Sequence, residues 1–231
     1  MEVCAPRPSR YHSMPDATAS CRDADPVQRI RAALKGSSEA PPRPVCPIEL
    51  PAGLRYLVKP GLLRALRHAA VLVPLVRVDG EWRVVLTLRA AHLRSHSGQV
   101  SFPGGRREEG DRSLADTAIR EAEEEIGLDP DGVEVIGYLD DYPTVTRFLV
   151  TPVVAVVQRA EPWVPDPGEV AEVFELPLSR VLNADRFRRK VFSREGLKVP
   201  FFELRHDGHR IWGATAGMLW NLNRKLHEHG H

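Results

Sequence analysis

The sequence has few cysteines, no long apolar run and little net charge, and each shortage narrows what the protein can be. Its three cysteines, Cys4, Cys21 and Cys46, form no C-x-x-C pair, which argues against a disulfide framework or a zinc site and fits a reducing cytoplasm. No apolar run reaches the roughly 18 residues needed to cross a membrane. The first residues also lack the apolar segment of a secretory signal.

The charges are nearly balanced, since 32 Lys and Arg oppose 31 Asp and Glu for a net charge of +1. This balance argues against a general binder of nucleic acid or of membrane surfaces, although a local basic patch stays open. Apolar residues make up 42% and charged residues 27%, as in an ordinary globular protein. We therefore expect one domain with extensions, with neither nucleic acid nor a membrane as a partner.

Composition divides the chain into three segments. Residues 1–25 are rich in Pro, Ser, Asp and Ala without periodicity, so we expect them to be disordered. Residues 26–65 are expected to form a short N-terminal helix followed by a Pro-rich linker or wrapped arm, because five prolines fall between 36 and 52. The main domain is expected over residues 66–231.

Strand and helix patterns alternate in the main segment. The strongest hairpin signal is Asp79-Gly80, which separates two β-branched apolar runs. Helical patterns cover 112–127, 178–182 and 214–227. Further strands are expected over 133–139, 149–157 and 170–176, and 189–192 is expected to pair with 197–204. The pattern predicts class α/β or α+β, with a mixed sheet flanked by helices.

The helix predicted over 112–127 carries the main functional signal. Ser113 is typical of an N-cap and Gly127 of the position after a helix end. At about 100° per residue, Glu121, Glu124 and Glu125 share one arc beside the apolar stripe of this helix. Three carboxylates are therefore expected to gather on one face.

This arrangement is locally unfavourable. Like charges at i,i+4 cost a few tenths of a kcal/mol, and carboxylates in the last turn face the negative end of the helix dipole at about 0.3–1 kcal/mol each. A divalent cation would remove both penalties, and carboxylates without His or Cys favour Mg²⁺ or Mn²⁺ over zinc. The alternative is a solvated acidic face, and Glu123, which points away from the other three, is expected to face solvent.

The segment before this helix has features of a phosphate-binding site. Gly104 and Gly105 would let backbone N–H groups approach a phosphate closely, and Arg89, Arg94 and His96 add positive charge upstream. Basic groups beside a cation-binding acidic cluster indicate a phosphate-containing substrate. An ordinary turn at the glycines, and a strand-end Arg paired with a carboxylate, are the structural alternatives.

Residues 120–128, REAEEEIGL, resemble the Nudix box, R-E-U-x-E-E-x-G-U with U apolar. Eight residues, rather than the usual seven, separate Asp111 from Arg120, which leaves the role of Asp111 open. Upstream, Arg89, Arg94, Gly98 and the run 102–105 (FPGG) resemble the signature of the coenzyme A pyrophosphatase branch of the Nudix hydrolases, which is similar also in having the longer box.

The resemblance implies the Nudix fold, an α/β/α sandwich around a mixed β-sheet. It implies a pyrophosphohydrolase, dependent on Mg²⁺ or Mn²⁺, that cleaves coenzyme A and its derivatives to 3′,5′-ADP and 4′-phosphopantetheine or its acylated form. Alternatives are hydrolysis of another nucleoside diphosphate derivative, such as ADP-ribose or NADH, and a non-catalytic module that senses a nucleotide. The expected partner is a small-molecule substrate, and a homodimer is left open.

The resemblance also implies roles for the residues of the box. Glu121 and Glu125 would be the principal Mg²⁺ ligands, with Glu124 as a third ligand or the holder of a metal-bound water. Arg120 is expected to orient one of these carboxylates through a bidentate pair.

Two further groups of residues are expected to act outside the box. Glu169, in a later loop, is the first candidate for the general base and Glu172 the second, with a solvated acid as the alternative for each. Arg89, Arg94 and His96 are expected to contact the substrate phosphates, including the 3′-phosphate of coenzyme A.

Overall fold

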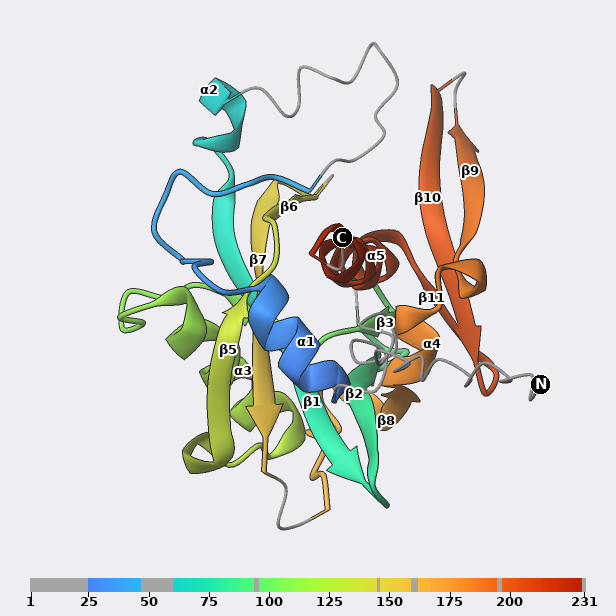
Figure 1. Ribbon diagram of the computed structural model, residues 1–231. Coiled ribbons are helices and arrows are strands. Elements are labelled where there is room, and N and C mark those ends of the chain that lie inside the picture. Colours follow the sequence, from blue (N-terminus) through green and yellow to red (C-terminus); the bar gives the residue numbers. More distant parts are fainter. Residues whose placement is uncertain are drawn as a thin grey trace, which may run out of the picture.

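The computed structural model describes residues 25–46, 60–93, 96–144, 146–158, 162–194 and 197–229. A mixed sheet lies at the centre, and helices cover both of its faces (Figure 1). Strand β1 (Arg67–Val78) runs parallel to β7 (Phe148–Val157), whereas its partner β2 (Glu81–Arg89) is antiparallel. The predicted mixed sheet between helices is therefore confirmed.

The central sheet has the strand order β3-β2-β1-β7-β5, with shorter strands added at its margins. Its remaining members are β3 (Val100–Ser101), β4 (Gly104–Arg106) on β1, β5 (Val133–Tyr138), β6 (Tyr142–Pro143) on β7, and β8 (Val170–Pro177) on β2. A second, three-stranded sheet has the order β11 (His209–Trp212), β10 (Leu197–His206), β9 (Arg188–Arg194). The pairing of β9 with β10 was predicted, but its separation from the central sheet was not.

The hairpin between β1 and β2 forms where the sequence predicts it. Asp79 has a φ of 50° and Gly80 a φ of 83°, so both turn residues lie in the left-handed region that a tight two-residue hairpin requires. Val78 and Glu81 then pair directly across the turn.

Helix α3 (Leu114–Ile126) covers one face of the sheet. The Ser113 hydroxyl accepts a hydrogen bond from the Asp116 N–H at the start of the helix, and Gly127 ends it with a φ of 64°. Ala122 and Ile126 are fully buried against the sheet, in the same apolar cluster as residues of β1 and β7. Both ends and the buried stripe of this helix are as predicted.

Helices α1 (Pro26–Ala33), α4 (Leu178–Leu182) and α5 (Gly213–Glu228) cover the opposite face (Figure 1). Ile30 of α1 is completely buried in the same cluster as Leu219 and Leu222 of α5. The N-terminal helix thus contributes to the core of the main domain instead of standing apart from it. A single-turn helix α2 (Pro60–Leu63) precedes β1, and short 3-10 helices occupy Pro130–Gly132 and Ala184–Arg186.

The Pro-rich arm lies against the sheet over the residues that the structure describes. The side chain of Arg43 is 6% exposed, and it donates hydrogen bonds to Asp141 Oδ1 (2.7 Å) and to the Leu139 carbonyl (2.6 Å). The backbone of Pro44 and Cys46 also bonds to that of Asp141. These contacts attach the arm to the domain, as a wrapped arm requires. The segment 1–24 lies outside the described residues, and within them no helix is long and apolar enough to cross a membrane.

Candidate active site

Four charged side chains from different elements meet beside the C-terminal half of α3. Glu121 and Glu125 come from the helix, Arg89 ends β2, and Glu169 lies in the turn that precedes β8. Arg89 Nη1 lies 3.4 Å from Glu125 Oε1, and Nη2 lies 4.0 Å from Glu169 Oε2. The structure therefore brings together residues that the sequence assigned separately to the metal, the substrate and the base.

Glu125 is the most deeply buried acid of this group, with 4% of its side chain exposed. Burial raises its pKa to about 7, although the Gly104 N–H and Arg89 oppose the shift, and the charges of Glu169 and Glu121 raise it further. The Gly104 N–H donates to Glu125 Oε2 at 3.1 Å. The positive groups around Glu125 therefore do not fully neutralise the carboxylates of this site.

Glu121 lies one turn earlier on α3, against the backbone of β4. Burial raises the pKa of Glu121, Arg120 opposes this shift, and the neighbouring charges of Glu124 and Glu169 add to it. A Cβ on Gly105 would lie 2.3 Å from Glu121 Oε2, closer than non-bonded atoms approach. Only glycine at this position leaves room for the carboxylate where it lies.

The two glycines serve this site in a different way from the one we expected. They belong to strand β4 rather than to an open phosphate loop, and the Gly104 N–H is already donated to Glu125. Gly104 has a φ of 148°, and a Cβ there would lie 2.5 Å from the Ala70 carbonyl oxygen and from Val71 Cα. The structure explains the glycine pair by close backbone packing of β4 against β1 and α3.

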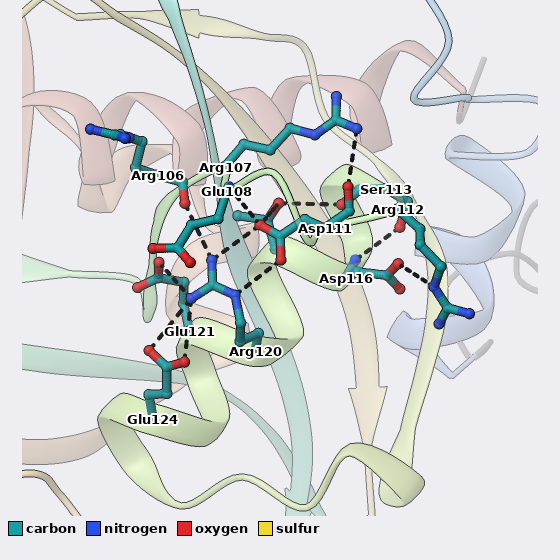
Figure 2. Close-up of polar contacts among 11 residues, drawn as sticks. Arg106, Arg107, Glu108, Asp111, Arg112, Ser113, Asp116, Arg120, Glu121 and Glu124 are labelled. Carbon is teal, nitrogen blue, oxygen red and sulfur yellow. Dashed lines mark hydrogen bonds and ion pairs between the residues drawn. The ribbon is translucent and has the colours of Figure 1, made fainter.

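Arg120 occupies the centre of a polar network at the side of this cluster (Figure 2). Its Nε and Nη2 lie 3.0 and 3.1 Å from the two carboxylate oxygens of Asp111. Its Nη1 lies 3.1 Å from Glu121 Oε1 and 3.4 Å from both oxygens of Glu124. The predicted bidentate pair exists, but its partner is Asp111, and Arg120 contacts the glutamates through one nitrogen.

Asp111 is the residue that the sequence left without a role. Hydrogen bonds from Arg120 hold the pKa of this carboxyl well below its usual range, against the opposing effect of burial. The Thr117 hydroxyl and the Glu108 N–H also donate to Asp111 Oδ2, each at 2.9 Å. Asp111 therefore fixes Arg120 in place. The signal available in the sequence was an acid at a set distance before the box.

Glu124 and Glu123 differ less in exposure than the helix geometry predicts. Glu123 is exposed, as expected, but the side chain of Glu124 is also 60% exposed. Within the described ranges, no three Asp, Glu, His or Cys side chains are placed to hold a metal ion. The carboxylates match Mg²⁺ or Mn²⁺ in chemistry. In this structure Glu121 and Glu124 accept hydrogen bonds from Arg120, and Glu125 accepts one from the Gly104 N–H.

The remaining candidates lie in different surroundings. Glu172 pairs with His209 of the second sheet, its Oε2 lying 3.1 Å from the imidazole Nε2. His96 is exposed, with its Nδ1 2.9 Å from Gln99 Oε1. Arg94 lies outside the described residues. Of the two basic candidates that the structure describes, Arg89 is the one that lies against the carboxylates.

Comparison with known proteins defines the class to which this fold and site belong. The family model of the NUDIX domain matches residues 66–195. The chain is also 42% identical over 156 residues to "Uncharacterized Nudix hydrolase NudL" of Salmonella paratyphi B and of Salmonella newport, over 68% of this chain and 81% of each relative. The chain belongs to the Nudix hydrolase family, and it is an enzyme acting on phosphoric anhydride bonds of nucleoside diphosphate derivatives.

A solved structure with a similar fold is that of the Nudix hydrolase RenU from M. smegmatis. It matches with a TM-score of 0.47 and 21% sequence identity, over 68% of this chain and 84% of that one.

Proposed function

We propose that this Nudix hydrolase cleaves the diphosphate of coenzyme A and its derivatives, releasing 3′,5′-ADP and 4′-phosphopantetheine or its acylated form. The observation that carries the proposal is the contact of Arg89 with Glu125. Arg89 belongs to the upstream segment that resembles the coenzyme A branch, and Glu125 belongs to the box. The contact supports joining the two motifs in one site. The proposed compartment is the cytoplasm, where a free thiol such as Cys46 stays reduced.

Glu121, Glu124 and Glu125 are the proposed ligands of a Mg²⁺ or Mn²⁺ cofactor. When bound, such a cation lowers the pKa of a coordinated water and neutralises charge on the diphosphate oxygens. The crowding of carboxylates supports this assignment, because burial and mutual repulsion together raise the pKa of Glu125 to about 7. A cation would remove that penalty and keep Glu125 ionised.

Arg120 and Asp111 are the proposed positioning pair for these ligands. Arg120 donates to Glu121 while Asp111 holds its other nitrogens, so the orientation of Glu121 depends on a salt bridge outside the acidic cluster. A ligand held in this way loses less conformational freedom when it binds a cation.

Glu169 is the proposed general base. Its carboxylate is half exposed and lies 4.0 Å from Arg89 at the margin of the acidic cluster, where a proton can pass to solvent. Glu172 is the weaker candidate, because its carboxylate is paired with His209. Arg89 holds Glu125 and Glu169 near each other, and it is also the proposed contact for a substrate phosphate.

The substrate is tested by incubating the purified chain with coenzyme A, acetyl-coenzyme A, ADP-ribose and NADH in the presence of Mg²⁺. We expect 3′,5′-ADP from the two coenzymes, identified by chromatography and mass, with higher kcat/KM than for the other two compounds. Preferential cleavage of ADP-ribose or NADH would contradict the substrate while keeping the chemistry. Absence of turnover on all four with Mg²⁺ and with Mn²⁺ would favour a nucleotide-sensing module.

The ligand role is tested by Glu125→Gln, with Glu123→Gln as the matched control on the same helix. Glutamine keeps an oxygen acceptor for the Gly104 N–H, so the melting temperature should change little. Turnover should fall roughly 100- to 1,000-fold, since a lost charged ligand removes several kcal/mol of stabilisation. Exposed Glu123 should be replaceable without effect. Equal turnover of the two variants would refute the role of Glu125.

A further inference from the structure

The second sheet concentrates positive charge that the composition of the whole chain conceals. Its three strands, RRKVFSR, LKVPFFELRH and HRIW, contain seven Lys or Arg and one Glu, a net charge of +6. Because the complete chain carries +1, the remainder carries −5. The expectation of no nucleic-acid partner rested on the total, and it left a local patch open.

Three of these seven cations surround a single buried carboxylate. Glu203 of β10 has 1% of its side chain exposed, and Lys190 Nζ (3.0 Å), Arg205 Nε (3.2 Å) and Arg210 Nε (2.6 Å) all lie against it. Burial alone would raise the pKa of Glu203, but the hydrogen bonds from these cations lower it to about 2. One negative charge therefore holds three cations in fixed positions and leaves two of them uncompensated.

The ladder register places these cations on one face. Arg205 and Arg210 lie directly opposite each other across β10 and β11, a like-charge pair that normally destabilises a sheet. The alternate residues of β10, such as Phe202 and Leu204, pack inward on the core of the main domain. The face with Glu203 and its cations is therefore the outward one.

Aromatic rings lie among the cations on the same face. Phe192 of β9 is 52% exposed, and Phe201 and Trp212 are partly buried with ring centroids 5.9 Å apart. The Arg210 guanidinium lies over the Trp212 ring, 5.0 Å from its centroid. Rings alternating with cations on an open sheet are typical of surfaces that bind single-stranded nucleic acid, where bases stack and phosphates pair with Lys and Arg.

We propose that the outward face of β9–β11 is a docking surface for single-stranded nucleic acid, separate from the hydrolase reaction. Charge complementarity argues for a polyanion, since the face has an excess of cations. A second copy of this chain is disfavoured as the occupant, because β9 has four cations and no acid in seven residues and would meet the same charges. The fixed positions of the cations and the nearby flat rings favour bases with phosphates over a fluid lipid surface.

The surface is tested by fluorescence anisotropy with a labelled single-stranded oligonucleotide about a dozen nucleotides long. The full chain is used with a chelator present, so that turnover plays no part. We expect binding that weakens with salt, with a slope of roughly −0.7 per phosphate contact. Phe192→Ala should weaken it roughly 5- to 100-fold through lost stacking. Arg188 of β9 is exposed and lies opposite Glu203, so Arg188→Gln should lower the salt slope by roughly 0.7.

Matched controls lie outside this face. Val164→Ala removes another exposed apolar side chain, and Arg112→Gln removes a cation whose side chain is 90% exposed. Neither control should change binding. The proposal is overturned if the oligonucleotide does not bind, or if Phe192→Ala and Val164→Ala bind it equally. Equal binding of heparin, which has no bases, would overturn it too, as would binding confined to phosphatidylserine vesicles.

Discussion

Replacing Asp111 by Asn is expected to destabilise the protein and to disorder the candidate active site together. The Asp111 carboxylate forms a bidentate pair with Arg120 at 3.0 and 3.1 Å and accepts two further hydrogen bonds. Asparagine has nearly the same shape and can still accept from Thr117 and the Glu108 N–H. The substitution therefore removes chiefly the negative charge that faces Arg120.

The magnitude follows from the burial of the two partners. Removing one member of a buried ion pair costs about 3–5 kcal/mol. The Arg120 side chain is 27% exposed and keeps Glu121 as a partner, so solvent and the remaining carboxylate offset part of this loss. We expect about 2–3 kcal/mol at neutral pH, or roughly 4–12 °C in the melting temperature for a domain of this size.

The pH dependence gives a sharper test. The pKa of Asp111 is lowered in the folded state by hydrogen bonds from Arg120, so its contribution to stability is complete above its ordinary value of 3.8 and is lost as pH falls further. The difference in unfolding free energy between wild type and Asp111→Asn should be constant from pH 5 to 7, a range about one unit or more above that value, and should shrink below about pH 4.

Urea unfolding at several pH values measures this difference directly. Asp116→Asn is the control, because the ion pair of Asp116 is with the exposed Arg112 at the start of α3, and its loss should change stability by less than about 1 kcal/mol. Titration calorimetry with Mn²⁺ should also show roughly 10- to 100-fold weaker binding for Asp111→Asn, because Arg120 no longer fixes Glu121. Unfolding and Mn²⁺ binding like those of the wild type would refute the positioning role.

Two further substitutions test close packing and the arm. Gly105→Ala should reduce turnover sharply, because its Cβ would lie 2.3 Å from Glu121 Oε2 and the carboxylate would have to move. Gly110→Ala, whose Cβ would have nothing within 4 Å, should leave kcat unchanged, and equal kinetics of the two variants would contradict the packing argument. Arg43→Met should lower the free energy of unfolding in urea by about 3–5 kcal/mol, because it leaves the Asp141 side chain, which is 7% exposed, without its cation. A loss below about 1 kcal/mol would show that the arm contributes little to stability.

Local chemistry determined much of the fold before any contact was known. Ser113 and Gly127 mark the ends of α3 because capping depends on the side chain or backbone freedom of single residues. Asp79-Gly80 defines a hairpin because its turn needs two residues with positive φ. The box itself could be read from residues 120–128 because its members are neighbours on one helix.

The tertiary structure alone decided which distant groups meet these glutamates. Arg89 reaches Glu125 across 36 positions and Asp111 holds Arg120 across nine, and no periodicity reports such pairs. The inward docking of α1 and the separate second sheet likewise depend on which apolar faces remain to be covered once the central sheet has formed. The physical reason is that side-chain pairing over long separations depends on the packing of whole elements, whereas caps and turns depend on a few adjacent residues.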